Sequence, residues 1–505
     1  MIKYKWGGDM KKKLVMLLAM AMSMSIFTVN TLACTGIVVG KDMTADGTIM
    51  MGRTEDIGSA YNKNFVVVEA KDNKVGTYFE DLNGFKIEEP KHTYKYTMVP
   101  DVEEHGDGIY GEAGMNEKGV AMSATVSAQI NEAVEKYDPL VDNGIREAAM
   151  LSVVLPRISS AKEGVKVLGD IVSKYGAAEG NIVLFADQDE AWYMEILSGH
   201  QWAAVKVPDD AYAVIPNCFM LGYIDLSDTE NVMASKDIIN LPTKQGFLKE
   251  KDGKFNLALT YGETLTEGNR MRAWGGKHFF SPSQDIAYDS EVFELFTTAD
   301  EKISLEDVME LQRYRYEDTI YNVNLEENKT KRAIGTENQA ECHIFQMTKS
   351  LPKEVGGVMW MAMGNAEHSV YLPSYNIITD TADAYKVQGE EYSAQSAYWA
   401  FRSLSTLAEL NREAYGESVR DFWKAYEQKL IANQTACNAK ISELYKKNAK
   451  EASSYATELT MGIQNDAIDK AQVMFSELMT KVAKDKGQTP KKNYMPSIAT
   501  SLEEK

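Results

Sequence analysis

Hydrophobic positions along this chain follow two different spacings. Up to about residue 215, short apolar runs bounded by glycine and polar turns predict strands, at 34–40, 48–53, 65–70, 120–125, 181–186, 191–196, 201–207 and 211–215. Between these runs, segments 144–155 and 161–175 repeat their apolar residues at helical spacing. Strands, paired helices and strands again are the order expected of one layered domain, which we place at residues 34–390.

The pattern becomes helical throughout in the last part of the chain. No proline occurs between Pro373 and Pro490, and apolar residues recur at intervals of three and four. We predict several long helices over 391–486, packed against the sheet domain or forming a dimer surface. Residues 487–505 are predicted to be a mobile tail.

The first 33 residues have a pattern of their own. Lysines at 11–13 precede an apolar run over 14–29, and small side chains lead up to Ala33. These are the basic, apolar and small-residue zones of a secretory signal peptide. We therefore expect export across the cytoplasmic membrane, to the periplasm or the exterior, and removal of residues 1–33, by signal peptidase or by self-cleavage. Cys34 then becomes the first residue of the mature chain.

An N-terminal cysteine carries a nucleophile and a base on one residue. The thiol attacks, and the α-amine, whose pKa is roughly 7.7–8.0, accepts its proton. Two alternatives remain: a residue after a signal peptide with no chemical role, or a lipoprotein with an acylated Cys34 sulfur. A lipoprotein signal typically has leucine three residues before the cysteine. This chain has Thr31 at that position and Leu32 at the next one.

Charged residues follow the second predicted strand. Residues 34–40 and 48–53 predict a hairpin, and Gly52-Arg-Thr-Glu-Asp56 places charges near the open end of its first strand. Arg53 could stabilise a thiolate, and Asp56 could accept a hydrogen bond from the ammonium that forms. An ordinary surface ion pair is the alternative.

Several motifs occur in a fixed order. They are Cys34-Thr-Gly, Gly52-Arg-Thr-Glu-Asp56, Tyr110-Gly-Glu-Ala-Gly-Met-Asn-Glu-Lys-Gly-Val-Ala-Met-Ser-Ala-Thr125, Val207-Pro-Asp-Asp-Ala-Tyr-Ala-Val-Ile-Pro-Asn217, Arg272-Ala-Trp274 and Ser369-Val-Tyr-Leu-Pro373. Together they resemble the secreted dipeptidases of peptidase family C69. The resemblance extends from Cys34 to about residue 430.

This resemblance implies an α+β fold, an αββα sandwich of the N-terminal-nucleophile hydrolase type, with the nucleophile at the first strand. It also implies a relationship to penicillin V acylases and bile salt hydrolases. The catalytic residues that it carries over are Cys34, Arg53, Asp56, Asn217 for the oxyanion hole, and Arg272. Glu112 and Glu117 are candidates for binding a substrate ammonium group.

Composition agrees with an exported hydrolase. Without residues 1–33 the chain has 49 basic and 73 acidic residues, a net charge of −24. Such a surface disfavours nucleic acid and anionic membranes, and no apolar stretch after the leader is long enough for a membrane span. The six histidines lack metal-binding spacing and no phosphate loop is visible, so we expect no metal and no cofactor. Whether Cys218, Cys342 and Cys437 pair is left open.

The sequence hypothesis is a secreted cysteine dipeptidase acting by acyl transfer to Cys34. Its partners would be dipeptide substrates and, in a homo-oligomer, a second copy of the chain. The alternatives are an acylase of N-acyl amides, which would share the same catalytic residues, and a membrane-tethered binding lipoprotein.

Overall fold

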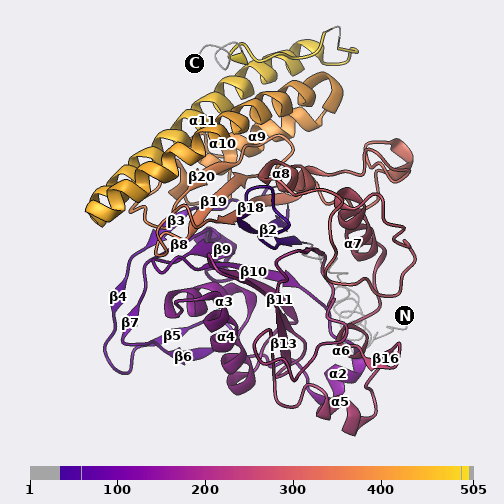
Figure 1. Ribbon diagram of the computed structural model, residues 1–505. Helices are drawn as coiled ribbons and strands as arrows, with labels where there is room; N and C mark the ends of the chain where they lie inside the picture. Colours follow the sequence, from indigo (N-terminus) through magenta and orange to yellow (C-terminus); the bar gives the residue numbers. More distant parts are fainter. Residues whose placement is uncertain (1–33, 59, 491, 500–505) are drawn as a thin grey trace, which may run out of the picture. The chain divides into compact units, whose positions relative to one another are not determined.

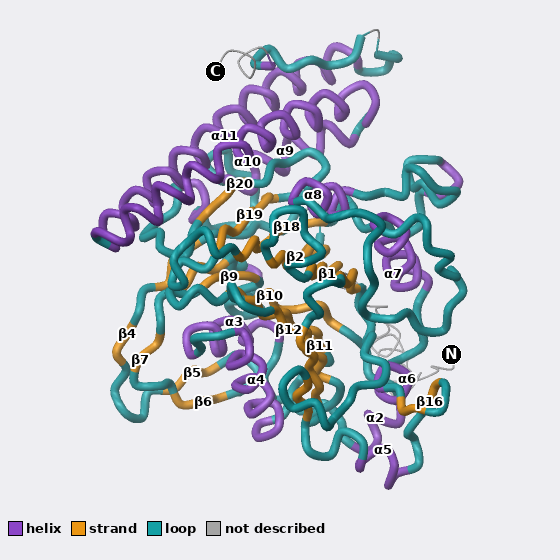
Figure 2. The backbone as a smooth tube through the Cα atoms, viewed as in Figure 1, coloured by secondary structure: helices purple, strands orange, loops and turns teal. Residues whose placement is uncertain are grey.

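The computed structural model describes residues 34–58, 60–490 and 492–499. The predicted signal peptide, residues 1–33, lies outside the described residues. Two six-stranded sheets form the centre of the described chain, and Figures 1 and 2 show helices on both sides of them.

The first sheet contains the strand that follows Cys34. Its strands pair antiparallel in the order β14 (Tyr212–Ile215), β1 (Thr35–Val39), β2 (Ile49–Asp56), β18 (Gln339–Met347), β19 (Gly357–Met363) and β20 (Leu372–Ser374). Every residue of β1 and β2 is buried, as expected of strands in the middle of a layered protein.

The second sheet is also antiparallel. Its order is β15 (Val232–Ala234), β13 (Trp202–Lys206), β12 (Ala191–Ile196), β11 (Asn181–Ala186), β10 (Ala121–Ser127) and β9 (Ala113–Met115). Strand β2 of the first sheet contacts β10 and β11 of the second. The two sheets therefore pack face to face around a shared apolar core.

Helices cover the outer face of each sheet. Helices α3 (Glu147–Val154) and α4 (Ala161–Tyr175) pack on β10–β13, whereas α7 (Glu267–Phe280), α8 (Leu305–Arg313) and α9 (Ala397–Glu409) pack on the first sheet. Gly164 and Gly169 let α4 approach closely, since a Cβ at either position would collide with the ring of Phe185 or Trp202. The predicted αββα sandwich is confirmed.

One predicted helix starts later than expected. The pattern favoured a start at Gly144, but α3 begins at Glu147 because Ile145 forms a parallel β-bridge with Ala177 and is held extended. The helix then tightens into the 3₁₀ turn η2 (Leu155–Arg157), which contains Pro156.

Long helices form the end of the described chain. Helix α10 (Glu417–Lys447) packs against α11 (Ala449–Asp485), and α11 contacts α9 and β20. The predicted boundary at residue 390 falls between η4 (Asp383–Lys386) and α9; the domain division stays a prediction. Within the segment predicted as a tail, Tyr494 is buried and its backbone N–H donates to the carbonyl oxygen of Ala414 at 2.8 Å.

Shorter elements complete the described chain. They are β3 (Val66–Val68), β4 (Lys71–Asp72), β5 (Tyr78–Glu80), β6 (Lys86–Glu88), β7 (His92–Thr93), β8 (Tyr96–Met98), β16 (Glu250–Lys251), β17 (Lys254–Phe255), α2 (Glu132–Tyr137), α5 (Asn240–Gln245), α6 (Leu257–Tyr261), η1 (Glu103–His105), η3 (Glu326–Asn328) and η5 (Arg412–Gly416). Within the described residues, no helix combines the length and apolar character needed to cross a bilayer.

Candidate active site

Cys34 lies immediately before strand β1, between the two sheets. In the β1–β2 hairpin Thr35 pairs with Thr54, and the backbone N–H of Thr35 donates to the Thr54 hydroxyl at 3.2 Å. This register brings the end of β2, with Arg53 and Asp56, beside Cys34, as the sequence predicted. Only 2% of Cys34 is exposed. All four cysteines are free thiols.

Arg53 contacts the Cys34 thiol directly. Its Nη1 lies 3.6 Å from Sγ, and its Nη2 forms a buried ion pair with Glu112. Burial opposes the charge of Arg53, but the surrounding groups, Glu112 foremost and then Cys34, Glu55 and Glu341, more than compensate, so the pKa of Arg53 stays above its ordinary value. Burial raises the pKa of the Cys34 thiol, and the guanidinium is the main group that lowers it. A thiolate at this position would therefore depend on Arg53.

Two further carboxylates reach Arg53 from separate elements. Glu147, the first residue of α3, lies 3.8 Å from Nη1 and accepts a hydrogen bond from the Ser127 hydroxyl at 3.1 Å. Glu341 of β18 lies 3.8 Å from Nη2 and is bound to His343 Nδ1 at 2.9 Å. Neither residue is recognisable in the sequence, because an isolated glutamate carries no motif.

Asn217 and Arg272 meet at the backbone of Cys34. Arg272, on α7, donates from Nη1 to the Cys34 carbonyl oxygen and to Asn217 Oδ1, the latter at 2.8 Å. Asn217 follows β14, and its Nδ2 donates to the Ser127 carbonyl oxygen at 2.9 Å. Burial and the nearby charge of Arg332 lower the pKa of Arg272 to about 10, which leaves it protonated at neutral pH.

Asp56 is held by Arg332, which belongs to none of the sequence motifs. Arg332 donates from Nη2 to Asp56 Oδ2, and the other oxygen, Oδ1, is buried without a hydrogen bond among the described residues. Burial raises the pKa of Asp56, whereas Arg332 and then Arg272 lower it. The unused acceptor leaves Asp56 able to bind one more donor.

The structure separates the two glutamates that were predicted to bind an ammonium group. Glu112 precedes β9 and its side chain is buried against Arg53. Glu117 follows the other end of β9, and its carboxylate, 31% exposed, lies 3.9 Å from His92 Nε2. Glu112 therefore joins the Cys34 cluster and Glu117 does not.

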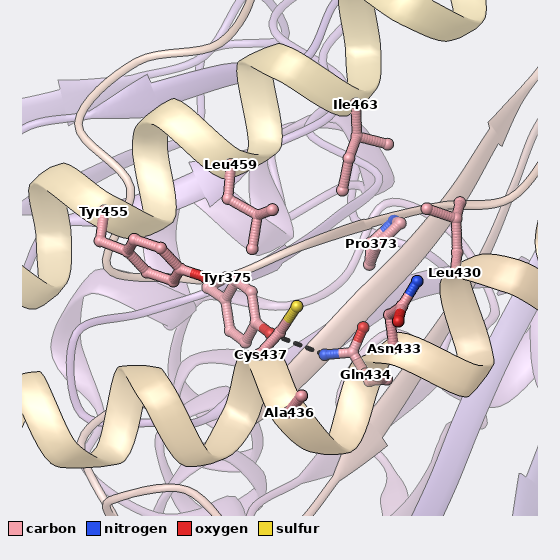
Figure 3. Close-up of a pocket in the computed structure, with 10 residues that line it drawn as sticks. All are labelled: Pro373, Tyr375, Leu430, Asn433, Gln434, Ala436, Cys437, Tyr455, Leu459 and Ile463. Atoms are coloured by element: carbon pink, nitrogen blue, oxygen red, sulfur yellow. Dashed lines mark hydrogen bonds between the residues drawn. The ribbon is translucent and has the colours of Figure 1, made fainter. Parts of the chain in front are cut away.

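A cavity of about 350 Å³ lies elsewhere, between α10, α11 and the end of β20 (Figure 3). Tyr375, Cys437 and Leu459 are among its lining residues, and Gln434 Nε2 donates to the Tyr375 hydroxyl at 2.6 Å. None of the residues around Cys34 lines this cavity.

The chain is similar to known dipeptidases over most of its length. The model of the family described as "Peptidase family C69" matches residues 33–425. "Probable dipeptidase B" of Streptococcus pyogenes serotype M1 is 41% identical over 474 residues, covering 91% of this chain and 94% of that protein. "Dipeptidase A" of Lactobacillus helveticus is 32% identical over 414 residues, covering 79% and 86%.

Similarity to solved structures is more distant. The structure of penicillin V acylase from Agrobacterium tumefaciens has a TM-score of 0.31 and 12% sequence identity, covering 68% of this chain and 86% of that chain. A mutant of the conjugated bile acid hydrolase from Clostridium perfringens has a TM-score of 0.29 and 14% identity, covering 68% and 92%.

Proposed function

Because the chain belongs to peptidase family C69, we propose that it is a dipeptidase with the Cys34 thiol as its nucleophile. Relatives that cover most of its length are named dipeptidases. The observation that carries the proposal is the contact between Arg53 Nη1 and Cys34 Sγ at 3.6 Å inside a buried site. Such a contact stabilises a thiolate, the reactive form of cysteine.

The proposed mature enzyme begins at Cys34, after export and removal of residues 1–33. The basic, apolar and small-residue zones of that segment support this proposal, as does a family match that starts at residue 33. The enzyme would then act outside the cytoplasmic membrane, in the periplasm or the exterior.

The α-amine of Cys34 serves as the general base in this mechanism. It takes the thiol proton through a water molecule, because the two groups belong to one residue. Asp56 is suited to bind the resulting ammonium, since its Oδ1 is buried and accepts no other hydrogen bond among the described residues. Arg53 stabilises the sulfur while its negative charge develops.

Attack of the sulfur on the dipeptide carbonyl places a negative charge on the carbonyl oxygen. The Asn217 amide has two N–H groups, of which one donates to Ser127. The second N–H, together with a backbone N–H, would hold the oxyanion, and Arg272 keeps the amide in that orientation. The Cys34 ammonium then protonates the leaving amino group. Water finally hydrolyses the thioester and regenerates the thiol.

A mass measurement followed by a substrate panel tests this function. We expect the exported protein to have the mass of residues 34–505 with an unmodified N-terminus, and to hydrolyse free dipeptides faster than N-acylated amino acids. A diacylglyceryl mass increment on Cys34 would instead indicate a membrane-tethered protein. Faster cleavage of N-acylated amino acids would assign the site to an acylase.

A further inference from the structure

Glu147, the first residue of α3, places its carboxylate next to the arginine that contacts the nucleophile. Arg53 Nη1 lies 3.6 Å from Cys34 Sγ and 3.8 Å from Glu147 Oε1, so this oxygen is within about 7.4 Å of the sulfur. The first turn of a helix also stabilises a negative charge through its backbone dipoles. A carboxylate is therefore maintained close to the reacting atoms.

Glu147 also faces solvent more than the carboxylates around it. The side chains of Glu112, Glu55 and Glu341 are at most 1% exposed, whereas that of Glu147 is 6% exposed. Among these four carboxylates, Glu147 is therefore the best placed to meet an incoming substrate.

The half-buried Glu179 adds negative charge beside this position. Its Oε2 accepts the backbone N–H of Glu147 at 2.9 Å. Tyr110 lies next to both carboxylates. Burial and then Glu147 and Glu179 raise the pKa of its phenol, which therefore stays neutral. The two carboxylates of Glu147 and Glu179 together favour a cation at this position.

Glu147 is distinct from Asp56, the residue that is suited to bind the α-amine of Cys34 itself. Asp56, with its unused oxygen, is paired with Arg332, and Arg272 contacts the Cys34 carbonyl oxygen. Glu147 contacts Arg53, which lies on the sulfur side. An ammonium group that comes in with the substrate is a suitable ligand for this carboxylate.

The distances fit the free amino terminus of a dipeptide. Its nitrogen is about 2.5 Å from the carbonyl carbon that is attacked, because the two atoms are separated by one Cα. The attacking sulfur stands about 3–3.5 Å from that carbon, and an ammonium–carboxylate hydrogen bond adds about 2.8 Å. A carboxylate within about 7.4 Å of the sulfur can therefore bind the ammonium of a correctly placed substrate.

We propose that Glu147 binds the α-ammonium group of the substrate and so selects peptides with a free amino terminus. The proposal rests on the dipeptidase function proposed above. It assigns to Glu147 the role for which the sequence suggested Glu112 and Glu117.

The test compares a dipeptide with its desamino analogue, L-alanyl-L-alanine with propionyl-L-alanine, in the mature full-length enzyme. For Glu147→Gln we expect kcat/KM on the dipeptide to fall about 10- to 100-fold, the effect of losing a hydrogen bond to a charged group. On propionyl-L-alanine, which has no ammonium, the variant and the wild type should agree within about threefold. Glu117→Gln is the matched control, since Glu117 lies outside the cluster, and it should match the wild type on both substrates.

Two results would overturn the assignment. An equal loss on both substrates would mean that Glu147 supports the site structurally or chemically, and no loss on either would mean that the ammonium binds elsewhere. Glu147→Asp keeps the charge and provides a second variant if Glu147→Gln does not fold; it should retain a preference for the dipeptide over propionyl-L-alanine. Failure of the underlying function looks different, because the wild type itself would then not hydrolyse the dipeptide.

Discussion

Arg272 Nη1 donates to the side-chain oxygen of Asn217 at 2.8 Å and also to the backbone carbonyl oxygen of Cys34. One guanidinium thus sets both the position of the nucleophile and the direction of the amide that is proposed to hold the oxyanion. Since catalysis depends on interactions that strengthen in the transition state, loss of the Asn217 amide should slow the chemical step.

Asn217→Ala should lower kcat by about 10²–10³ with little change in KM, because the oxyanion exists only after attack. Steady-state kinetics on a dipeptide measure both constants. Asn269 Nδ2 donates to the Asn217 carbonyl oxygen at 2.8 Å, so thermal unfolding should be recorded to show that the local structure survives. A change confined to KM would place Asn217 in substrate binding and the oxyanion hole elsewhere.

Cys34→Ala should abolish hydrolysis while the protein still folds, and Cys34→Ser should retain weak activity at most, because a hydroxyl is a poorer nucleophile near neutral pH. Cys437→Ser is the matched control, since Cys437 lines the cavity between α10 and α11 (Figure 3). Its activity should equal that of the wild type. Full activity of purified Cys34→Ala would show that Cys34 is not the nucleophile.

Activity should require a free α-amine on Cys34. With Ala33 attached, the nitrogen is an amide and cannot accept a proton, although Arg53 still contacts the sulfur. We expect a protein starting at Cys34 to be active and one with a stable N-terminal extension to be inactive. The N-terminus of each protein is confirmed by mass, and both proteins are then assayed on the same dipeptide. Equal turnover from the extended protein would show that another residue is the base.

Glu427→Ala should destabilise the fold by about 3–5 kcal/mol, the cost of leaving a buried partner charge uncompensated. Glu427, on α10, binds Arg313 at the end of α8 through two hydrogen bonds of 2.6 and 3.0 Å, and both side chains are buried. Denaturant unfolding measures the change. Glu443→Ala removes an exposed pair with Lys447 on the same helix and should leave the unfolding midpoint unchanged. Similar effects of the two substitutions would mean that the buried pair does not couple α10 to α8.

The stability of the fold should decrease below about pH 6.5 because of His368. Burial lowers the pKa of this imidazole to about 4, whereas the unfolded chain binds the proton below about pH 6.5. Between these values unfolding takes up a proton, so the free energy of unfolding falls by roughly 1.4 kcal/mol per pH unit as the pH decreases.

Urea unfolding between pH 4 and 7 measures this slope. His368→Gln should flatten it, whereas His92→Gln, a change at an exposed histidine, should retain it. An unchanged slope in His368→Gln would assign the acid sensitivity to other groups.

Local sequence alone was sufficient to predict the bounds of several elements. Helix α4 occupies the predicted residues 161–175, because the Ser160 hydroxyl accepts the N–H of Glu163 at its start and Gly176 ends it. Strands β11 and β12 also have the predicted bounds, since each is a short apolar run between turns. The contact of Arg53 with Cys34 was predictable for a related reason: the two residues belong to one hairpin, whose register follows from the alternation along its strands.

Only the tertiary structure decided which distant residues complete the site. Glu147 comes from a helix on the second sheet, and Arg332 from the segment between α8 and β18, yet both contact residues of β2. In the sequence each is one more charged residue, with the same pattern as a solvated surface position. Alternation along a strand indicates which side chains face inward, but not which residues of the other layer lie opposite, because that pairing is set by how the two sheets pack.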